Sequence, residues 1–386
     1  MQPIPYGRQD ISQADIDAVV EVLHSDFLTQ GPAVARFEGA VLAHTGASHA
    51  LAMNSATSAL HVACMALGLG PGDYLWTTPV TFVASANCAL YCGAEVDFVD
   101  IDPRTYNLCP DALTRKLEAA EVGGRLPKIV VPVHLSGQPC DMKRLHALSQ
   151  RYGFRLIEDA SHAVGGTYLG EPIGNCRYSD ICIFSFHPVK IITTAEGGMA
   201  LTNDAELARQ MNLLRTHGIT RDPSLMTRSD GPWYYEQLAL GYNYRMTDMQ
   251  AALGASQMAR IEQFIDRRHE LAARYDRLLA DLPLTLPWQH PDGRSGLHLY
   301  VVRLQLDRTN RTHREVFDEL RARGVLVNLH YIPIYRQPYY APFGHDAADF
   351  PESEAYYREA ISIPMFHAMS DAQQDQVVEA LKDILG

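Results

Sequence analysis

Residues 185–198, SFHPVKIITTAEGG, place Lys190 between two apolar runs at 181–184 and 199–201. Short apolar runs of this kind are typical of buried strands, so we expect Lys190 on the connection between two of them, near a glycine pair that lets the backbone turn tightly. An amine in such a place is poorly hydrated and its neutral form becomes accessible, as Schiff-base chemistry with an aldehyde requires. The alternative interpretation is an ordinary solvated loop lysine.

A second polar segment, RLIEDASHA at residues 155–163, supplies an acidic partner. An apolar run that ends in carboxylates and small residues indicates the carboxyl end of a core strand, where ligands collect in open α/β sheets. Asp159 could hold a proton on a pyridine nitrogen and so make the ring a better electron acceptor, or it could simply cap a following helix. It precedes Lys190 by 31 residues, about the length of one βαβ unit, so the two can meet at one edge of a sheet.

A third segment, NSATS at residues 54–58, follows an expected strand at 49–53 and precedes an expected helix at 59–67. Hydroxyl groups and free backbone amides at a helix N-terminus can bind a phosphate group. Ser and Thr are also ordinary N-caps, so this segment supports a phosphate site only together with the other two.

Strand and helix patterns alternate along most of the chain. The expected elements include strands at 95–99, 128–133, 155–157 and 299–304, and helices at 110–120 and 142–152. This alternation predicts an α/β fold with a mainly parallel sheet covered on both faces. A long helical pattern at about 248–282 is followed by mixed strands and helices. We therefore expect a large domain at 1–250 and a smaller C-terminal α+β domain at 251–386.

Composition excludes several classes of protein. The chain has 386 residues, of which 47% are hydrophobic and 20% charged, as in a globular enzyme with a large core. A net charge of -12 without a Lys/Arg-rich block argues against a nucleic-acid partner. The seven cysteines form no Cys-x-x-Cys pair, so no metal is expected. Neither a signal peptide nor a run of membrane-spanning length is visible, which predicts a cytoplasmic protein without a membrane partner.

These segments together resemble the sugar-nucleotide aminotransferases of the DegT/DnrJ/EryC/StrS type, which are pyridoxal-phosphate enzymes. The resemblance covers essentially the whole chain, and its specific parts are residues 54–60, 78–87, 155–163, 185–198 and 241–248. It implies the aspartate-aminotransferase fold (fold type I), with a seven-stranded, mainly parallel sheet in the large domain. It also implies pyridoxal 5'-phosphate as the cofactor.

By this resemblance Lys190 carries the Schiff base and later moves a proton between the substrate carbon and the cofactor. Asp159 pairs with the pyridine nitrogen, and His162, where many relatives have Gln, approaches the phenolic oxygen of the ring. The other implied cofactor contacts are Phe82 on the face of the ring, Ala56, Thr57 and Ser185 at the phosphate, and Asn243 at the phosphate of the neighbouring subunit. The active site then needs two chains, so the resemblance implies a homodimer with shared sites.

Within the family the chain is most similar to the transaminases of the pseudaminic acid pathway. The features that point there are LTQG at 28–31, SFH at 185–187, ITTAEGG at 192–198 and HYIPIY at 330–335. They imply transfer of an amino group from L-glutamate to C4 of a UDP-linked 4-keto-6-deoxy-N-acetylhexosamine, which gives UDP-4-amino-4,6-dideoxy-N-acetyl-β-L-altrosamine. The implied sugar-nucleotide contacts are Tyr6, Asp26, Phe27, Leu28, Thr29, His330, Tyr331, Ile332 and Pro333, of which Asp26, Phe27 and Ile332 differ from the relatives.

Four other functions compete with this interpretation. A perosamine-type or other GDP- or dTDP-linked keto-sugar aminotransferase remains open. A pyridoxamine-phosphate-dependent sugar dehydratase would carry His in place of Lys190, and a cysteine desulfurase would need an exposed loop cysteine near that lysine. A non-enzymatic regulator that keeps the fold would have lost the pair of Lys190 and Asp159.

Overall fold

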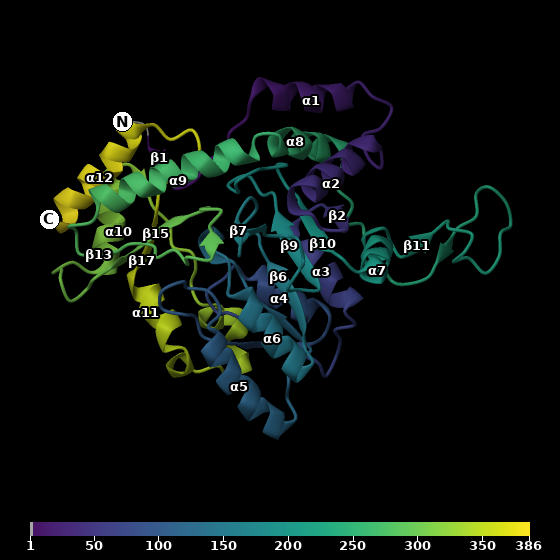
Figure 1. The fold of residues 1–386 in the computed structure, drawn as a ribbon, viewed down its shortest axis with the longest axis horizontal. Helices are drawn as coiled ribbons and strands as arrows, with labels where there is room; N and C mark the ends of the chain where they lie inside the picture. The colour runs from purple at the N-terminus through teal and green to yellow at the C-terminus, as the bar shows by residue number, and fades with distance from the viewer. Residues whose placement is uncertain (1–2) are drawn as a thin grey trace.

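A computed structural model describes residues 3–386, and a seven-stranded sheet lies at its centre (Figure 1). Across the sheet the strands follow the order β2 (His49–Met53), β10 (Gly198–Thr202), β9 (Ile181–Ser185), β6 (Arg155–Asp159), β5 (Ile129–Val131), β3 (Tyr74–Thr77) and β4 (Glu95–Phe98). In this sheet β10 alone runs antiparallel to its neighbours. The expected α/β fold with a mainly parallel sheet is confirmed.

Helices cover both faces of the sheet because its strands are apolar on both sides. One face carries α3 (Ala56–Ala66), α4 (Ala84–Tyr91) and α7 (Ala205–Arg215), and the other carries α2 (Pro32–Thr45), α5 (Pro110–Gly123), α6 (Met142–Tyr152) and α8 (Asp248–Met258). The side chains of β9 alternate accordingly. Ile181 and Ile183 pack against the first layer, whereas Cys182 and Phe184 pack against the second.

The C-terminal part of the chain is an α+β unit. Its antiparallel sheet contains β13 (Leu284–Thr285), β15 (Tyr300–Leu304) and β17 (Ala360–Ile363), and its helices are α10 (His313–Ala322), α11 (Pro351–Glu359) and α12 (Asp371–Leu385). Near the N-terminus, β1 (Ile4–Pro5) pairs in parallel with β16 (Val325–Leu326). The first described residues therefore belong to this part of the fold as well.

Helix α9 (Ile261–Leu278) connects the two parts of the molecule. Its first turns, with Phe264 and Ile265, pack in the same apolar cluster as α2. Its later turns, with Leu271 and Tyr275, pack in the C-terminal cluster. Helix α9 therefore packs against the central part of the molecule at its start and against the C-terminal part at its end. The domain division expected at residue 250 stays a prediction.

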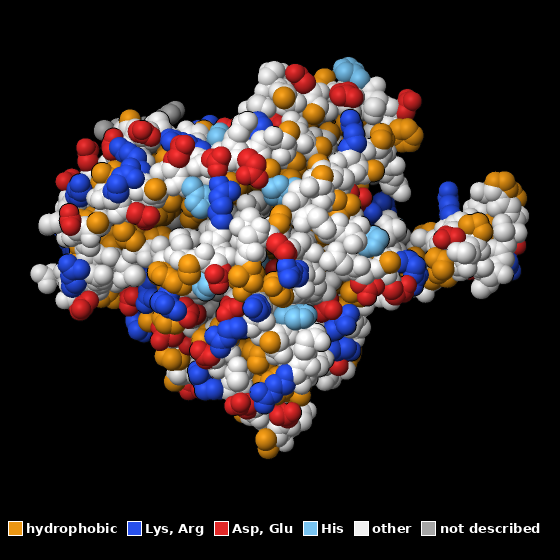
Figure 2. Space-filling model, viewed as in Figure 1, with side chains coloured by type: hydrophobic (Ala, Val, Ile, Leu, Met, Phe, Trp, Pro, Cys, Tyr) orange, Lys and Arg blue, Asp and Glu red, His pale blue; other side chains and the backbone are white. Residues whose placement is uncertain are grey.

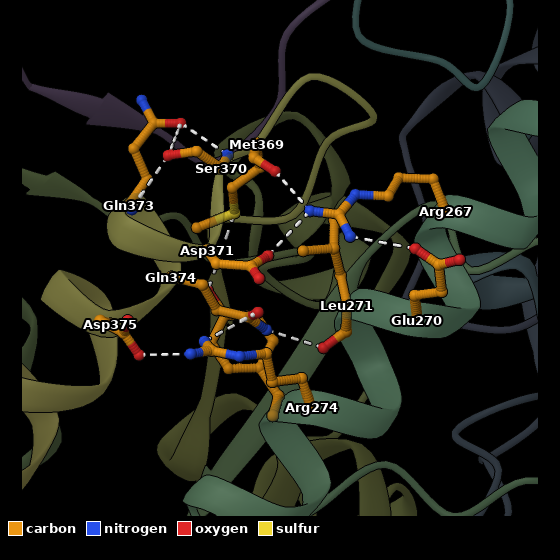
Figure 3. A network of polar contacts seen from close by, with 11 residues as sticks. Arg267, Glu270, Leu271, Arg274, Met369, Ser370, Asp371, Gln373, Gln374 and Asp375 are labelled. Atoms are coloured by element: carbon orange, nitrogen blue, oxygen red, sulfur yellow. Dashed lines mark hydrogen bonds and ion pairs between the residues drawn. The ribbon is translucent and has the colours of Figure 1, made fainter.

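Two arginines of α9 hold α12 in place (Figure 3). Arg267 donates to the carbonyl oxygen of Met369 at 2.9 Å and to Oδ1 of Asp371 at 3.1 Å. Arg274 donates to Asp375 at 2.6 Å. Because exposed ion pairs contribute little stability, the apolar cluster beneath them carries most of the attachment, and the arginines fix its orientation.

The helical pattern expected at about 248–282 corresponds to two helices, α8 and α9. The backbone leaves helical geometry at Arg260, where φ is -111°. The guanidinium of Arg260 binds Asp10 at 2.7 Å and the buried Asp15 at 2.6 Å. Asp15 also closes the capping box with Ser12 at the start of α1 (Gln13–Leu23), which lies over α8 (Figure 1). The break between α8 and α9 therefore lies where Arg260 contacts Asp10 and Asp15, which are distant in the sequence.

A hairpin projects from the body beyond α7 (Figure 1). It is built on β11 (Ile219–Thr220) and β12 (Glu236–Gln237), and residues 219–241 are called the arm below. A smaller sheet contains β7 (Thr167–Tyr168), β8 (Glu171–Pro172) and β14 (Gly293–Arg294). Short 3₁₀ helices lie at Leu135–Gly137, Ile334–Arg336, Pro338–Phe343 and Ala347–Asp349. Over residues 3–386, no helix is both long enough and apolar enough to span a membrane.

Asp248 caps a helix distant from it in the sequence. Its buried carboxylate accepts the N–H groups of Gly31 at 2.8 Å and Ala33 at 2.9 Å, at the start of α2.

We predict that Asp248→Ala lowers the free energy of unfolding by about 2 kcal/mol or more, because two buried N–H groups lose their acceptor. Urea unfolding followed by circular dichroism measures this. The matched control is the exposed cap Asp204 of α7, where Asp204→Ala should cost about 1 kcal/mol. Equal losses would contradict the argument.

Candidate active site

A cavity of about 560 Å³ lies at the carboxyl edge of the central sheet. Asp159 ends β6, Ser185 ends β9, and residues after β2 and β3 complete this side of the wall. Parallel strands leave their carboxyl ends on one edge, which is why these segments meet. The opposite wall comes from Tyr6, His298 and residues 328–331 of the C-terminal part. The cavity therefore lies between the two parts of the chain.

The loop that carries Lys190 connects β9 to β10, and two backbone hydrogen bonds hold its ends together. Phe186 donates its N–H to the carbonyl oxygen of Gly197 and accepts that of Thr194, both at 2.9 Å. The expectation that the glycine pair makes the tight turn was wrong, because Ala195 adopts the left-handed conformation, with φ of 66°. Gly198 allows the start of β10 to approach the start of α3 closely, since a Cβ at this position would lie 2.3 Å from the backbone nitrogen of Ala56.

Lys190 is partly accessible from the cavity but surrounded by protein atoms. Burial lowers the pKa of its amine to about 8, while the negative charge of Asp159 acts in the opposite direction. A substantial fraction of the amine is therefore neutral near pH 8, as a nucleophile or proton acceptor requires. The interpretation of Lys190 as a solvated loop lysine does not fit this environment.

Asp159 is buried, and protein donors hold both of its carboxylate oxygens. Oδ2 accepts the hydroxyl of Ser85 at 2.6 Å, and Oδ1 accepts the N–H of Ser161 at 3.2 Å. Residues 160–166 contain turns and no helix. Asp159 is therefore not the cap of a following helix, and its carboxylate lines the cavity instead.

His162 presents an N–H group to the cavity. Its Nδ1 accepts the N–H of Ser136 at 3.2 Å, so we assign the proton of the neutral ring to Nε2, which lies 3.2 Å from the hydroxyl of Tyr331. Burial, with Lys190 and His330 nearby, holds the pKa of His162 well below its usual range. The ring of His162 is therefore a neutral N–H donor in the cavity wall.

His330 is also neutral. Its Nδ1 lies 2.8 Å from the hydroxyl of Ser362 and its Nε2 lies 3.3 Å from the amide nitrogen of Asn328. Burial, with Lys190 nearby, lowers the pKa of His330 to about 3. The ring packs against Tyr6, with 5.0 Å between their centroids.

The N-terminus of α3 fits a phosphate group. Ser55 caps this helix and accepts the N–H of Ser58 at 3.1 Å. The N–H groups of Ala56 and Thr57 belong to the first turn, where helix N–H groups have no intrahelical acceptor. Thr57 and Ser185, which carry hydroxyl groups, also line the cavity. Oriented N–H groups at a helix N-terminus favour an anion.

Phe82 fits a planar ring, because 57% of its side chain is exposed and it lines the cavity. An aromatic face beside a buried carboxylate, a lysine and an anion-binding helix N-terminus matches the donor set that pyridoxal phosphate needs. The residues of this chain therefore fit that cofactor.

The structure brings most of the predicted site residues together. Lining the cavity are Tyr6, Ala56, Thr57, Phe82, Asp159, His162, Ser185, Lys190, His330 and Tyr331. In the described chain, Asn243, residues 26–29, Ile332 and Pro333 lie outside this wall. Asn243 is exposed beside Asn54, whose amide contacts its carbonyl oxygen at 3.3 Å. Leu28 accepts the N–H of Asp248 at 3.0 Å. The roles predicted for these residues stay predictions.

Several polar residues of the cavity wall were not assigned a role from the sequence. They include Thr81, Ser85, His298 and Asn328. Thr81 and Ser85 lie within the segment 78–87 that carried part of the resemblance, but Thr81 precedes α4, so helical spacing could not have paired the two residues. His298 and Asn328 come from the C-terminal part, and local sequence carries no signal for their approach to Lys190.

Comparisons with known proteins agree with this chemistry. A family model of the DegT/DnrJ/EryC1/StrS aminotransferases matches residues 9–382. The spore coat polysaccharide biosynthesis protein SpsC of Bacillus subtilis is 41% identical over 385 residues, covering 99% of this chain and 97% of the relative. The structure is similar to that of Helicobacter pylori PseC, an aminotransferase involved in the biosynthesis of pseudoaminic acid. That likeness has a TM-score of 0.90 and 30% identity, and covers 100% of this chain and 99% of that one.

A second solved structure names the cofactor. The PLP-form of the putative sugar aminotransferase Spr1654 from Streptococcus pneumoniae has a TM-score of 0.87 and 28% identity, and covers 100% of both chains. Fold type I and pyridoxal phosphate, expected from the sequence, are thereby confirmed, and a transaminase is favoured over a dehydratase or a regulator. The chain belongs to the DegT/DnrJ/EryC1/StrS aminotransferase family and is a pyridoxal-phosphate-dependent sugar aminotransferase.

Proposed function

We propose that this enzyme moves an amino group from L-glutamate to C4 of a UDP-linked 4-keto-6-deoxy-N-acetylhexosamine, giving UDP-4-amino-4,6-dideoxy-N-acetyl-β-L-altrosamine. The observation that carries the proposal is the likeness to PseC over the whole chain. It coincides with the sequence features at 28–31, 185–187 and 330–335. A GDP- or dTDP-linked keto sugar is the competing substrate.

The walls of the cavity suggest how the cofactor is held. Pyridoxal phosphate, when bound, supplies an electron-accepting ring that stabilises negative charge on the carbon next to the transferred nitrogen. The N–H groups of Ala56 and Thr57 would hold the phosphate, and Phe82 would pack on the ring. Asp159 would face the ring nitrogen and favour its protonated state. His162 would donate its Nε2 proton to the phenolic oxygen.

Lys190 is suited to two tasks in this reaction. Its neutral amine can bond to the cofactor's aldehyde, and once released it can accept a proton from the reacting carbon and return it. A pKa of about 8 makes both protonation states accessible near neutral pH. The buried histidines around it are neutral, because the pKa values of His162, His298 and His330 are all lowered by burial. They can therefore donate or accept hydrogen bonds without adding positive charge.

A nucleotide sugar needs more than this cavity offers. Its two phosphates call for cationic partners. Among residues 3–386, however, the cavity wall includes Lys190 and no arginine. We propose that a second copy of the chain completes the site, which makes the active unit a homodimer.

The arm supports a second copy as the missing partner. Trp233 is 72% exposed and Leu240 is 75% exposed. Figure 2 shows hydrophobic side chains on the projecting arm, together with acidic and basic ones. Large exposed apolar side chains on a projecting hairpin favour packing against another molecule. Arg221 and Arg228, also on the arm, are cations that such packing could bring to a neighbouring site.

We predict that borohydride treatment of the holoenzyme fixes the cofactor covalently on Lys190, and that Lys190→Ala retains cofactor but loses transamination. The rate at which the apoprotein combines with pyridoxal phosphate should rise with pH around 8, because the neutral amine is the nucleophile. Peptide mass mapping and stopped-flow absorbance measure these outcomes. Lys128→Ala, which alters a lysine paired with Asp73 on the surface, is the control. Sustained turnover by Lys190→Ala without added amine would contradict the assignment.

A second prediction tests whether Asn243 reaches the neighbouring site. Mixing Lys190→Ala chains with Asn243→Ala chains under exchange conditions should restore activity, since one site of each hybrid dimer then keeps both residues. Lys190→Ala mixed with Asp159→Asn is the matched control and should stay inactive, because both residues line the cavity of the same chain. Failure of the first mixture to recover, with exchange verified by mass spectrometry, would place the whole site within one chain.

The third prediction concerns the substrate. The holoenzyme should convert to its pyridoxamine form with the UDP-linked 4-amino sugar and not with GDP-perosamine, as followed by absorbance. The same sugar without its nucleotide should lose turnover as well as affinity, because binding energy from the remote nucleotide holds C4 over the cofactor. Conversion with GDP-perosamine alone would refute the proposed substrate and leave the aminotransferase family assignment intact.

A further inference from the structure

Behind Asp159 lies a chain of two buried hydroxyl groups. The hydroxyl of Ser85 lies 2.6 Å from Oδ2 of Asp159, and the hydroxyl of Thr81 lies 2.9 Å from that of Ser85. Ser85 is 0% exposed and Thr81 is 2% exposed. A carboxylate can only accept, so Ser85 donates to Asp159, and the Ser85 oxygen is left to accept the proton of Thr81. The direction of both bonds is thus determined.

The same turn of chain that carries Ser85 also carries Phe82. Ser85 donates its N–H to the carbonyl oxygen of Phe82 at 3.2 Å, in the turn that opens α4. The aromatic wall of the cavity and the donor to Asp159 are therefore built on one rigid piece of backbone. With the N–H of Ser161 on Oδ1, the carboxylate cannot rotate without losing a hydrogen bond.

A purely structural explanation must also be considered, because buried carboxylates need donors wherever they lie. The chain contains a comparable case at a half-buried carboxylate. The hydroxyl of the buried Ser353 donates to Oδ1 of Asp100 at 2.6 Å, and Asp100 does not line the cavity. Ser85 differs because the carboxylate that it holds faces the reacting centre. The two serines therefore form a matched pair with the same local chemistry and different surroundings.

We propose that Ser85 is a positioning residue for transamination. It holds the carboxylate of Asp159 ionised and aimed at the ring nitrogen of pyridoxal phosphate, and Thr81 fixes the direction in which Ser85 donates. This inference rests on the role proposed above for Asp159. A hydrogen bond to the charged form of a carboxylate stabilises that form, and the charge in turn stabilises the proton on the ring nitrogen.

The test uses holoenzyme loaded with pyridoxal phosphate labelled with nitrogen-15 in the ring. Solid-state NMR reports whether this nitrogen is protonated, a readout that a merely structural serine would not move. In Ser85→Ala the signal should move toward the unprotonated state. Conversion to the pyridoxamine form by the amino donor should slow by roughly tenfold to a hundredfold, the scale of one hydrogen bond to a charged group, with little change in KM.

Three further variants make the result decisive. Ser85→Thr keeps the hydroxyl and should restore the wild-type signal, whereas Ser85→Cys keeps the volume without a strong donor and should behave like Ser85→Ala. Ser353→Ala should leave the ring nitrogen unchanged. A wild-type signal and rate in both Ser85→Ala and Ser85→Cys, with Asp159→Asn still losing the ring proton, would overturn the role of Ser85 alone. A protonated ring in Asp159→Asn would overturn the proposed role of Asp159 and this inference with it.

Discussion

The parallel pairing of β6 with β9 is the constraint on which the site depends. Ile157 is in register with Ile181, and Asp159 with Ile183, so both strands end at the same edge of the sheet. Asp159 faces the cavity there, and the chain that leaves β9 turns into the loop of Lys190. A shift of this register by one residue would reverse the faces of the side chains and move Asp159 away from the cavity.

Burial then sets the charge state of the groups at this edge. It lowers the pKa of Lys190 to about 8 and keeps His162, His298 and His330 neutral, since a charge in a poorly solvated place is costly. Ser85 and Ser161 donate to the two carboxylate oxygens of Asp159 and hold this side chain in place. The cavity thus places the carboxylate of Asp159 in the same wall as an amine that can lose its proton, a combination suited to amino transfer.

The cavity wall is built from different parts of the chain. The groups assigned to the cofactor come from the central sheet, whereas Tyr6, His298 and His330 stand on the opposite wall, in the C-terminal part. The family model matches residues 9–382 and so includes both of these parts. Asp26, Phe27 and Ile332, which the resemblance assigned to the sugar nucleotide, lie outside the cavity wall, so the residues that select the sugar stay a prediction.

The sequence by itself determined the elements whose signals are local. The strand at 49–53 and the helix at 142–152 have the predicted bounds, and Lys190 and Asp159 were recognised because each stands beside an apolar run. Tertiary structure alone decided that Asp159 caps no helix, that α8 and α9 separate at Arg260, and that Gly198 serves close approach. It also brought Ser85 to Asp159, across 74 residues of sequence. Periodicity and turn chemistry report how a residue relates to its neighbours in the chain, whereas these contacts join segments that meet only when the sheet has formed.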